Sequence, residues 1–321
     1  MSELLVLTDR RYAGDGSLSS MPDDYVANVI QEDRLVLEAL MRANVNARRV
    51  AWCDESIPWK DSLGALFRTT WDYFDRWDEF SRWLRSTSQV TELFNSAELV
   101  HWNLDKHYLH DLHERGVAVV PTAYVPRNAF VPLYDVAARR GWNQVVIKPA
   151  VAGAARDTYL VDAEGDTAIL SPEAPSGRES ERLWSDLVAQ QDMLVQPFLP
   201  DVMASGEVSV IWLEGQVTHA VLKRAKSGDF RVQDDHGGTV ERIELTPEHE
   251  RAARDIMEHT LDFCEDRGWA PPLYARVDLM RDAEGRLLLS ELEMVEPELW
   301  FRFCPEAADV LAQGVKRRLQ A

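Results

Sequence analysis

The sequence predicts a mixed α/β and α+β protein, with an N-terminal domain built on a parallel sheet followed by two α+β units. Over the first unit, short apolar strands alternate with amphipathic helices, a pattern typical of a parallel sheet flanked by helices. Further along, strands come in pairs joined by short turns, which indicates antiparallel hairpins. A length of 321 residues is enough for roughly two or three domains. We place these units at 1–100, 101–195 and 196–321.

Hydrophobic spacing defines the elements expected in the first domain. The string ELLVLT at 3–8 is a short buried strand, and the Gly-, Ser- and Pro-rich residues 12–24 form a loop. From Asp24 to Ala43, apolar residues recur at helical spacing. Strands follow at 47–52 and 63–69, and a helix carries the apolar residues of 74–84. This alternation gives the parallel sheet.

The two later units are expected to mix hairpins with helices. The second holds helices at 105–116, 131–142 and 180–191, a strand over 117–125 broken by a proline, a strand–loop–strand segment over 144–161 and a strand at 192–200. The third holds a hairpin over 207–225 turning at Glu214–Gly215, a Gly-rich stretch at 227–238, a helix at 247–267, a hairpin over 273–295 and a C-terminal helix.

The charge of the chain limits its partners. There are 54 Asp and Glu against 35 Lys and Arg, a formal charge of −19. This balance argues against a nucleic-acid binder, which needs a basic surface. A pocket can still oppose the overall field and bind a small anion. The central question is therefore where carboxylates converge.

Other features of the composition favour a cytoplasmic protein with no membrane partner. No apolar run approaches the roughly 20 residues of a membrane span, and the N-terminus has no signal-peptide pattern. The three cysteines are widely spaced and form no CxxC, so neither a disulfide framework nor a cysteine zinc site is expected. The 11 tryptophans are interpreted mainly as core and inter-domain packing. Oligomeric state cannot be read from the sequence.

The most informative stretch is the hairpin over 273–298. A turn near Ala283–Glu284 brings Asp278 opposite residues 289–291. Glu291 and Glu293 are two apart and face the same side. Carboxylates this close repel one another unless a cation neutralises them, and hard oxygen ligands suit Mg²⁺. The alternative is a solvated acidic strand face.

Three further signals point to a phosphate-bearing ligand, each weak alone. Lys148 ends the apolar strand VVIK and precedes a small-residue run, which can hold a phosphate chain; the alternative is a surface lysine. The string LVQPFL at 194–199 leaves free backbone groups beside Phe198 that can read an adenine. Arg231, followed by glycines at 237–238, can clasp a phosphate; the alternative, favoured when this signal is taken alone, is a mobile hairpin tip.

Other catalytic patterns are missing or misleading. His107, His110 and His113 are three apart on an expected helix, so they spread over too wide an arc for one metal site and are interpreted as exposed. There is no HExxH, no GxSxG elbow, no Walker A loop and no GxGxxG.

The order of these motifs resembles the ATP-grasp ligases over about residues 101–300. The resemblance rests on Lys148, the hinge VQPFL, an acid at Glu207, a Gly-rich loop with Arg231, and the final RVD…ELE. The strings RTTWDYF, WNLDKHYLHDLHERGVAVVPT and ELEMVEPELWF are similar to the glutathione-synthetase-like branch that includes the O-ureidoserine cyclo-ligases of cycloserine biosynthesis. The resemblance implies an ATP-grasp architecture, with two subdomains clasping ATP after a smaller N-terminal domain.

The resemblance also implies site roles, carried over position by position. Lys106 and Lys148 match lysines on the nucleotide phosphates, Gln196, Pro197, Phe198 and Leu199 match the adenine hinge, and Glu207 matches the acid near the ribose. Asp278 and Glu291 match Mg²⁺ ligands, and Glu293 stands where many members have Asn. Arg276 matches the arginine on the tetrahedral intermediate, Arg231 a basic residue on the γ-phosphate, and Gly153 part of a phosphate lid.

The expected function is ATP-dependent carboxylate–amine ligation of a small amino-acid-like substrate through an acyl phosphate, either between two molecules or within one. The cofactors would be ATP and two Mg²⁺ ions, with Mn²⁺ as a substitute. Arg68 and Asp72 could meet the substrate's carboxylate and ammonium, or form a structural ion pair; Glu296 and Glu298 could face an ammonium, or solvent. A small-molecule kinase and a catalytically silent nucleotide-binding protein are the alternatives.

Overall fold

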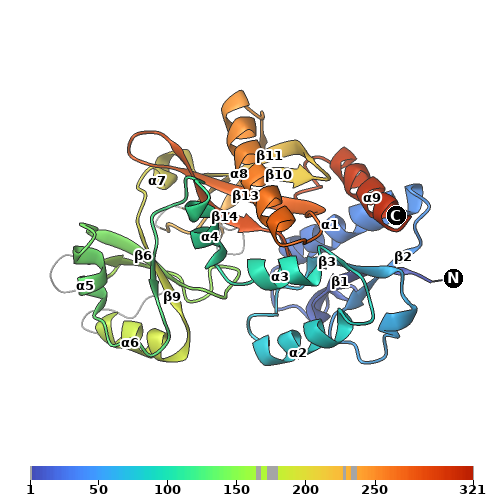
Figure 1. Ribbon diagram of the computed structural model, residues 1–321, viewed down its shortest axis with the longest axis horizontal. Helices are drawn as coiled ribbons and strands as arrows, with labels where there is room; N and C mark the ends of the chain where they lie inside the picture. Colours follow the sequence, from blue (N-terminus) through green and yellow to red (C-terminus); the bar gives the residue numbers. More distant parts are fainter. Residues whose placement is uncertain (1, 164–167, 172–179, 227–228, 233–236, 321) are drawn as a thin grey trace.

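The computed structural model describes residues 2–163, 168–171, 180–226, 229–232 and 237–320. These residues form three sheets, each the centre of one unit of the molecule. In Figure 1 the N-terminal unit (blue to cyan) and the C-terminal sheet (orange) lie together, while the central unit (green to yellow) projects to one side. The predicted Gly-rich stretch at 227–238 lies partly outside the described residues.

The N-terminal unit is the parallel sheet that the sequence predicted. Its strand order is β2-β1-β3-β4, and every pairing is parallel. β1 and β3 are buried along their whole length, which explains their nearly unbroken apolar sequence. The strands are β1 (Leu4–Thr8), β2 (Ala47–Ala51), β3 (Gly64–Thr69) and β4 (Leu93–Phe94), with helices α1 (Asp23–Arg42) and α2 (Trp77–Thr87) and 3₁₀ turns at Arg10–Tyr12 and Trp59–Asp61.

The central unit is an antiparallel sheet with the order β5-β9-β6-β7-β8. Its strands are β5 (Ala123–Val125), β6 (Gln144–Pro149), β7 (Tyr159–Asp162), β8 (Ala168–Ile169) and β9 (Met193–Pro197), and its helices are α5 (Leu133–Ala138) and α6 (Ser180–Gln190). Helices α3 (Ala97–Asn103) and α4 (Tyr108–Glu114) precede it. Helix α4 is shorter than the predicted 105–116.

The strand predicted over 117–125 is divided at Pro121. Only Ala123–Val125 joins the central sheet, while Val119 bridges in parallel to Leu289 of the C-terminal sheet. Proline has no N–H to continue a ladder, so the two halves of the segment pair with different sheets. This segment therefore links the two units.

The C-terminal unit is a second antiparallel sheet, ordered β12-β11-β10-β13-β14. Its strands are β10 (Glu207–Leu213), β11 (Gln216–Arg224), β12 (Thr239–Ile243), β13 (Tyr274–Arg281) and β14 (Leu287–Glu293), and its helices are α7 (Val202–Ser205), α8 (Pro247–Asp266) and α9 (Glu306–Arg318). Both predicted hairpins are present. The edge strand β12 was not predicted, because its charged sequence TVERI carries little apolar signal. None of the described helices is long and apolar enough to cross a membrane.

The two faces of this sheet have different partners. Val210, Trp212 and Val277 belong to a core cluster with Ile256 and Met257 of α8, the long helix lying across the sheet in Figure 1. On the other face, one end of β10 packs with α1 and α9. The other end of that second face carries charged side chains and forms the site described below.

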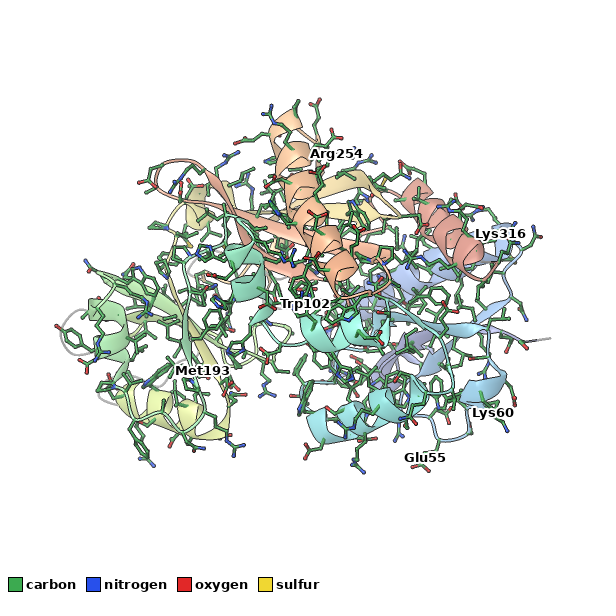
Figure 2. All side chains as sticks on the ribbon, in the orientation of Figure 1. Glu55, Lys60, Trp102, Met193, Arg254 and Lys316 are labelled. Carbon is green, nitrogen blue, oxygen red and sulfur yellow. The ribbon has the colours of Figure 1, made fainter. Side chains whose placement is uncertain are left out.

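One core joins the N-terminal unit to the C-terminal unit. Val36 and Leu40 of α1 cluster with Leu311 and Val315 of α9, together with Ile211 of β10. The central unit has its own core around β6, β9 and α6. Met193, labelled in Figure 2, lies in that separate core, whereas Trp102 stacks on Phe263 of α8 with ring centroids 4.4 Å apart.

Candidate active site

A cavity lies where the three units meet. The N-terminal unit contributes Tyr25, Trp71 and Phe74, and the other walls come from the central and C-terminal sheets. The residues predicted from the sequence that line it are Lys106, Lys148, Gly153, Gln196, Pro197, Phe198, Leu199, Glu207, Arg231, Arg276, Asp278, Glu291, Glu293, Glu296 and Glu298. Residues from distant parts of the chain therefore meet in one space.

Strand register explains why the charged residues gather. Glu207 pairs with Lys223 across β10 and β11, and Asp278 pairs with Glu291 across β13 and β14. Arg276 lies opposite Glu293 in the same hairpin. Side chains at paired positions share a face of the sheet. The predicted opposition of Asp278 to residues 289–291 is confirmed.

Asp278 is the centre of this charged face. Its side chain is 2 % exposed; Arg276 Nη2 lies 2.7 Å from its Oδ2, Lys223 Nζ lies 3.4 Å away, and Ser209 donates a hydrogen bond to Oδ1. Burial alone would raise the pKa of Asp278, but Arg276 and Lys223 outweigh it and lower that pKa to about 2. Asp278 is therefore an anion at neutral pH.

The two glutamates of β14 have different surroundings. Lys106 Nζ lies 2.9 Å from Glu291 Oε1 and also donates to the carbonyl of Ala152 at 2.5 Å. Burial opposes the charge on Glu291, but Lys106 and Lys148 lower its pKa. Glu293 is hydrogen-bonded by Arg276, yet burial raises its pKa to about 7. The chain's own cations thus hold both acids.

The carboxylate oxygens of these acids are suitable ligands for a divalent cation, but the acids are not arranged as a metal site in this structure. No group of three His, Cys, Asp or Glu side chains among the described residues is arranged to hold a metal ion. The expected three-carboxylate cluster is instead divided among Arg276, Lys223 and Lys106. Mg²⁺ commonly takes one or two carboxylates plus substrate phosphates, so the oxygens of Asp278 and Glu291 fit that requirement.

Lys148 differs from the other cavity lysines. Its side chain has no hydrogen bond or ion pair within the described part of the chain, whereas Lys106 and Lys223 are both paired. Burial lowers the pKa of Lys148, although Glu291 acts in the opposite direction. An unpaired cation in a cavity is suited to an anionic ligand.

An apolar slot adjoins these charges. It is formed by Val120, Val146, Phe198, Leu199 and Met280. The expected free donor at Phe198 is not available, because its N–H donates to the carbonyl of Gln144 at 2.9 Å. The N–H of Leu199 has no partner in the described ranges, so it is the hinge donor left for a ligand.

The small-residue loop after β6 packs against the N-terminal unit. A Cβ built on Gly153 would lie 2.8 Å from the Phe74 ring, so this close approach requires glycine. Arg156 donates to the carbonyl of Phe74 at 3.1 Å. Across the cavity, Arg231 forms an ion pair with Asp229 at 2.7 Å. The loop therefore closes one side of the cavity.

Two predicted substrate residues are not at the cavity. Asp72 accepts a hydrogen bond from the Trp52 indole at 2.7 Å and forms an ion pair with Arg76 at 2.8 Å. Arg68 is 1 % exposed, and its guanidinium lies 5.6 Å from the centroid of the Phe301 ring. Both faces of β3 are buried, and the Nε and Nη1 atoms of Arg68 have no hydrogen-bond partner among the described residues. Asp72 is therefore in a structural ion pair, but its partner is Arg76 rather than Arg68.

Sequence reasoning missed Lys223 and the aromatic wall. Lys223 is 5 % exposed at its side chain and lies 2.5 Å from Glu207. The predicted hairpin at Glu214–Gly215 would by itself place residue 222 opposite Glu207. A bulge between Ile211 and Trp212 shifts the register by one residue and brings Lys223 opposite Glu207 instead. Trp71 was interpreted as packing, and its place in the cavity depends on the distant loop at Glu296, whose carbonyl accepts its indole N–H at 2.9 Å.

The three spaced histidines do not form a metal site. His107 stacks on Tyr124 with ring centroids 4.8 Å apart and is hydrogen-bonded to Asp105. His110 and His113 are exposed, as predicted.

Comparison with known proteins agrees with this geometry. Residues 5–95 match the N-terminal domain of D-cycloserine synthetase DcsG, and residues 165–268 match the RimK-like ATP-grasp domain. The cycloserine biosynthesis protein DcsG of Streptomyces lavendulae is 29% identical over 304 residues, covering 89% of this chain and 93% of that protein.

Solved structures give the same result. A crystal structure of D-cycloserine synthetase DcsG matches with a TM-score of 0.80 and 26% identity, covering 99% of this chain and 100% of the other. A D-alanine–D-alanine ligase from Bacillus anthracis shares the fold, with a TM-score of 0.63 and 14% identity over 100% and 98% of the two chains. The chain has the fold of the ATP-grasp ligases, and residues 165–268 match an ATP-grasp domain family. Within that class it is similar to DcsG along nearly its whole length.

Proposed function

We propose that the chain is an ATP-dependent carboxylate–amine ligase that activates a small amino-acid-like substrate as an acyl phosphate and releases ADP and phosphate. The observation that supports this most strongly is one cavity that combines an apolar slot, the carboxylates of Asp278 and Glu291, and Lys148, which has no ion pair with any described residue. This combination suits a purine, a phosphate chain and its divalent cation.

The nucleotide would occupy the side of the cavity formed by the central unit. Gln196, Pro197, Phe198 and Leu199 line the slot for the adenine, and the free N–H of Leu199 would donate to the ring. Glu207, at the edge of this slot, would accept from the ribose. Lys106 and Lys148 would contact phosphate oxygens, with the loop at Gly153 closing over them.

Asp278 and Glu291 would hold Mg²⁺, with Glu293 as a further oxygen donor. When bound, the metal supplies positive charge that neutralises the phosphates of ATP. We propose that the site takes two Mg²⁺ ions and that Mn²⁺ can replace them. Arg276 would then be freed from Asp278, which it holds at 2.7 Å in the structure described here.

The residues of the chain would act on the carboxylate in two stages. A carboxylate is already an anion and resists attack by an amine, so transfer of the γ-phosphoryl group makes it an electrophile. Lys148 and Arg231 would stabilise the charge on the transferred group, since fixed cations need little reorganisation. The amine then attacks the acyl carbon, and Arg276 stabilises the resulting oxyanion. The bond from carbon to the phosphate oxygen breaks, phosphate leaves, and the nitrogen gives up one proton to the phosphate or to solvent.

The similarity to DcsG supports attack within one molecule. A cyclo-ligase needs only one amino-acid-like substrate, which carries both the carboxylate and the attacking nitrogen. We therefore propose O-ureidoserine-like compounds as the first substrates to examine.

The test is a screen of amino acids, dipeptides and both enantiomers of O-ureidoserine for ATP-dependent phosphate release, with mass spectrometry of the products. ADP and phosphate should appear together. Release of AMP and pyrophosphate would refute the proposal. Hydroxylamine should trap a hydroxamate, whereas a kinase that phosphorylates a hydroxyl group gives none. A product lighter than one substrate by one water indicates cyclisation.

A further inference from the structure

The segment after β14 is fixed in place by the other units. Tyr274 donates from its hydroxyl to the carbonyl of Val295 at 2.7 Å, and Asn95 donates to the carbonyl of Met294 at 2.7 Å. Trp71 donates to the carbonyl of Glu296 at 2.9 Å. The backbone at Glu296 is thus held before any ligand binds, and its side chain lines the cavity.

Glu296 differs from the other acids that line the cavity. Asp278, Glu291 and Glu293 are paired with Arg276, Lys106 or Lys223. Glu207 is paired with Lys223, and Glu298 with Arg302. Glu296 has no ion pair within the described ranges; its carboxylate is hydrogen-bonded to the hydroxyl of Tyr73. A carboxylate left without a cation in a preformed cavity is costly unless a ligand supplies one.

The electrostatics agree with this description. Burial, followed by the nearby charge of Glu293, raises the pKa of Glu296 to about 8. Burial, together with the charges of Glu296 and Glu293, also raises the pKa of the Tyr73 hydroxyl. A positive group beside Glu296 would relieve both effects.

We propose that Glu296 binds the cationic amino group of the substrate and thereby selects α-amino acids over the corresponding carboxylic acids. The inference rests on the proposed ligase function and assigns one residue of its substrate pocket. Trp71 and Tyr25, which also line the cavity with ring centroids 6.5 Å apart, supply aromatic faces to the same ammonium.

The chemistry of the pocket favours a primary ammonium over other cations. A guanidinium prefers to bind both oxygens of a carboxylate at once, but the Glu296 carboxylate already accepts a hydrogen bond from Tyr73. Mg²⁺ is better served by Asp278 and Glu291, which are directly opposite in register. An ammonium has three rotatable donors and needs only one free oxygen.

The experiment compares Glu296→Gln with wild type on matched probes. These are O-ureidoserine and alanine, each in both enantiomers, and their counterparts without the amino group, 3-(ureidooxy)propanoic acid and propanoic acid. Initial rates of phosphate release give KM for each probe and for ATP. Calorimetric titration with a non-hydrolysable ATP analogue present gives binding without turnover. Glu284→Gln, at an exposed turn, is the control for the charge change.

Glu296→Gln should raise KM and Kd for the amino acid by about 10- to 100-fold, the range expected for a charge-assisted hydrogen bond. KM for ATP and the affinity for the acids without an amino group should stay within about twofold, so the preference for the amino acid collapses. Tyr73→Phe should give a smaller change in the same direction. Glu284→Gln should behave as wild type.

Two results would overturn the inference and are distinguishable from each other. If Glu296→Gln keeps the wild-type preference for the amino group, or instead raises the Mg²⁺ requirement, the inference fails and the ligase proposal stands. If wild type releases no phosphate with any amino acid, the proposed function fails and takes the inference with it. Should Glu296→Gln not fold, the same preference measured for Tyr73→Phe decides the matter.

Discussion

The charged side chains at the two ends of the cavity differ in whether the chain itself supplies their partners. At the sheet end, Asp278 and Glu291 are each held by a cation of the chain itself. At the loop end, Glu296 has only a tyrosine hydroxyl, and across the cavity Lys148 has no partner among the described residues. Paired charges stabilise the fold, whereas we propose that a ligand pairs with Glu296 and Lys148. The predictions below test this difference.

The largest effect is expected at the sheet end. Asp278→Asn leaves Arg276 and Lys223 short of a counter-charge in a buried position, so the free energy of unfolding should fall by about 3 kcal/mol. Activity should fall more than about 100-fold, because the proposed metal ligand is lost. Urea unfolding and phosphate release measure the two effects.

The control for this variant is Glu248→Gln, which breaks the exposed ion pair with Arg281. An exposed pair contributes less than about 1 kcal/mol. Equal stability of the Asp278 and Glu248 variants would contradict the proposed division of the cavity.

The two lysines of the nucleotide side should separate binding from stability. Lys148→Met should weaken ATP binding by about 10- to 100-fold with no loss of stability, because Lys148 has no ion pair in the part of the chain that the structure describes. Lys106→Met removes the partner of Glu291 and of the Ala152 carbonyl, so it should lower stability by about 3 kcal/mol. Calorimetric titration with an ATP analogue, paired with urea unfolding, measures both. Two variants that are equally destabilised would rule out a special role for Lys148.

At the loop end, the Glu296 side chain should make the folded state less stable as pH rises. Because the pKa of Glu296 is raised to about 8 from an ordinary value of 4.5, the folded state holds a proton that the unfolded state has lost between these values. Stability therefore falls as pH rises through this window. Glu296→Gln removes that loss, so the variant should gain in melting temperature relative to wild type between pH 5 and pH 9. A constant difference across this range would contradict the assigned environment.

The smallest effect is expected where the loop meets the N-terminal unit. Gly153→Ala brings a methyl group to 2.8 Å from the Phe74 ring, which should cost about 1 kcal/mol of stability by overpacking. A several-fold loss in kcat/KM should accompany it. The double variant Gly153→Ala, Phe74→Leu should recover part of the loss, and failure to do so would place the strain elsewhere.

Features local in sequence were predictable, and features that depend on long-range contacts were not. Because a short turn fixes register to within about two residues, the position of Asp278 opposite residues 289–291 followed from one hairpin. The bulge between Asp278 and Leu279 then selects Glu291. The pairing of Glu207 with Lys223 did not follow in the same way, because a bulge between Ile211 and Trp212 shifts the register by one residue. In contrast, Trp71 meets Glu296 across 225 residues, and no local pattern carries that information. The substrate role of Arg68 stays a prediction, because a strand buried on both faces gives no sign of which face meets a ligand.

The core shared by α1 and α9 has a consequence for engineering. The N-terminal residues match a separate family domain, yet Val36 and Leu40 share their packing with Leu311 and Val315 at the far end of the chain. Exchanging the whole domain for that of a relative would replace half of this contact surface and leave the other half unmatched. Altering substrate preference is better attempted by grafting short segments, around Trp71 and around Glu296, onto an unchanged scaffold.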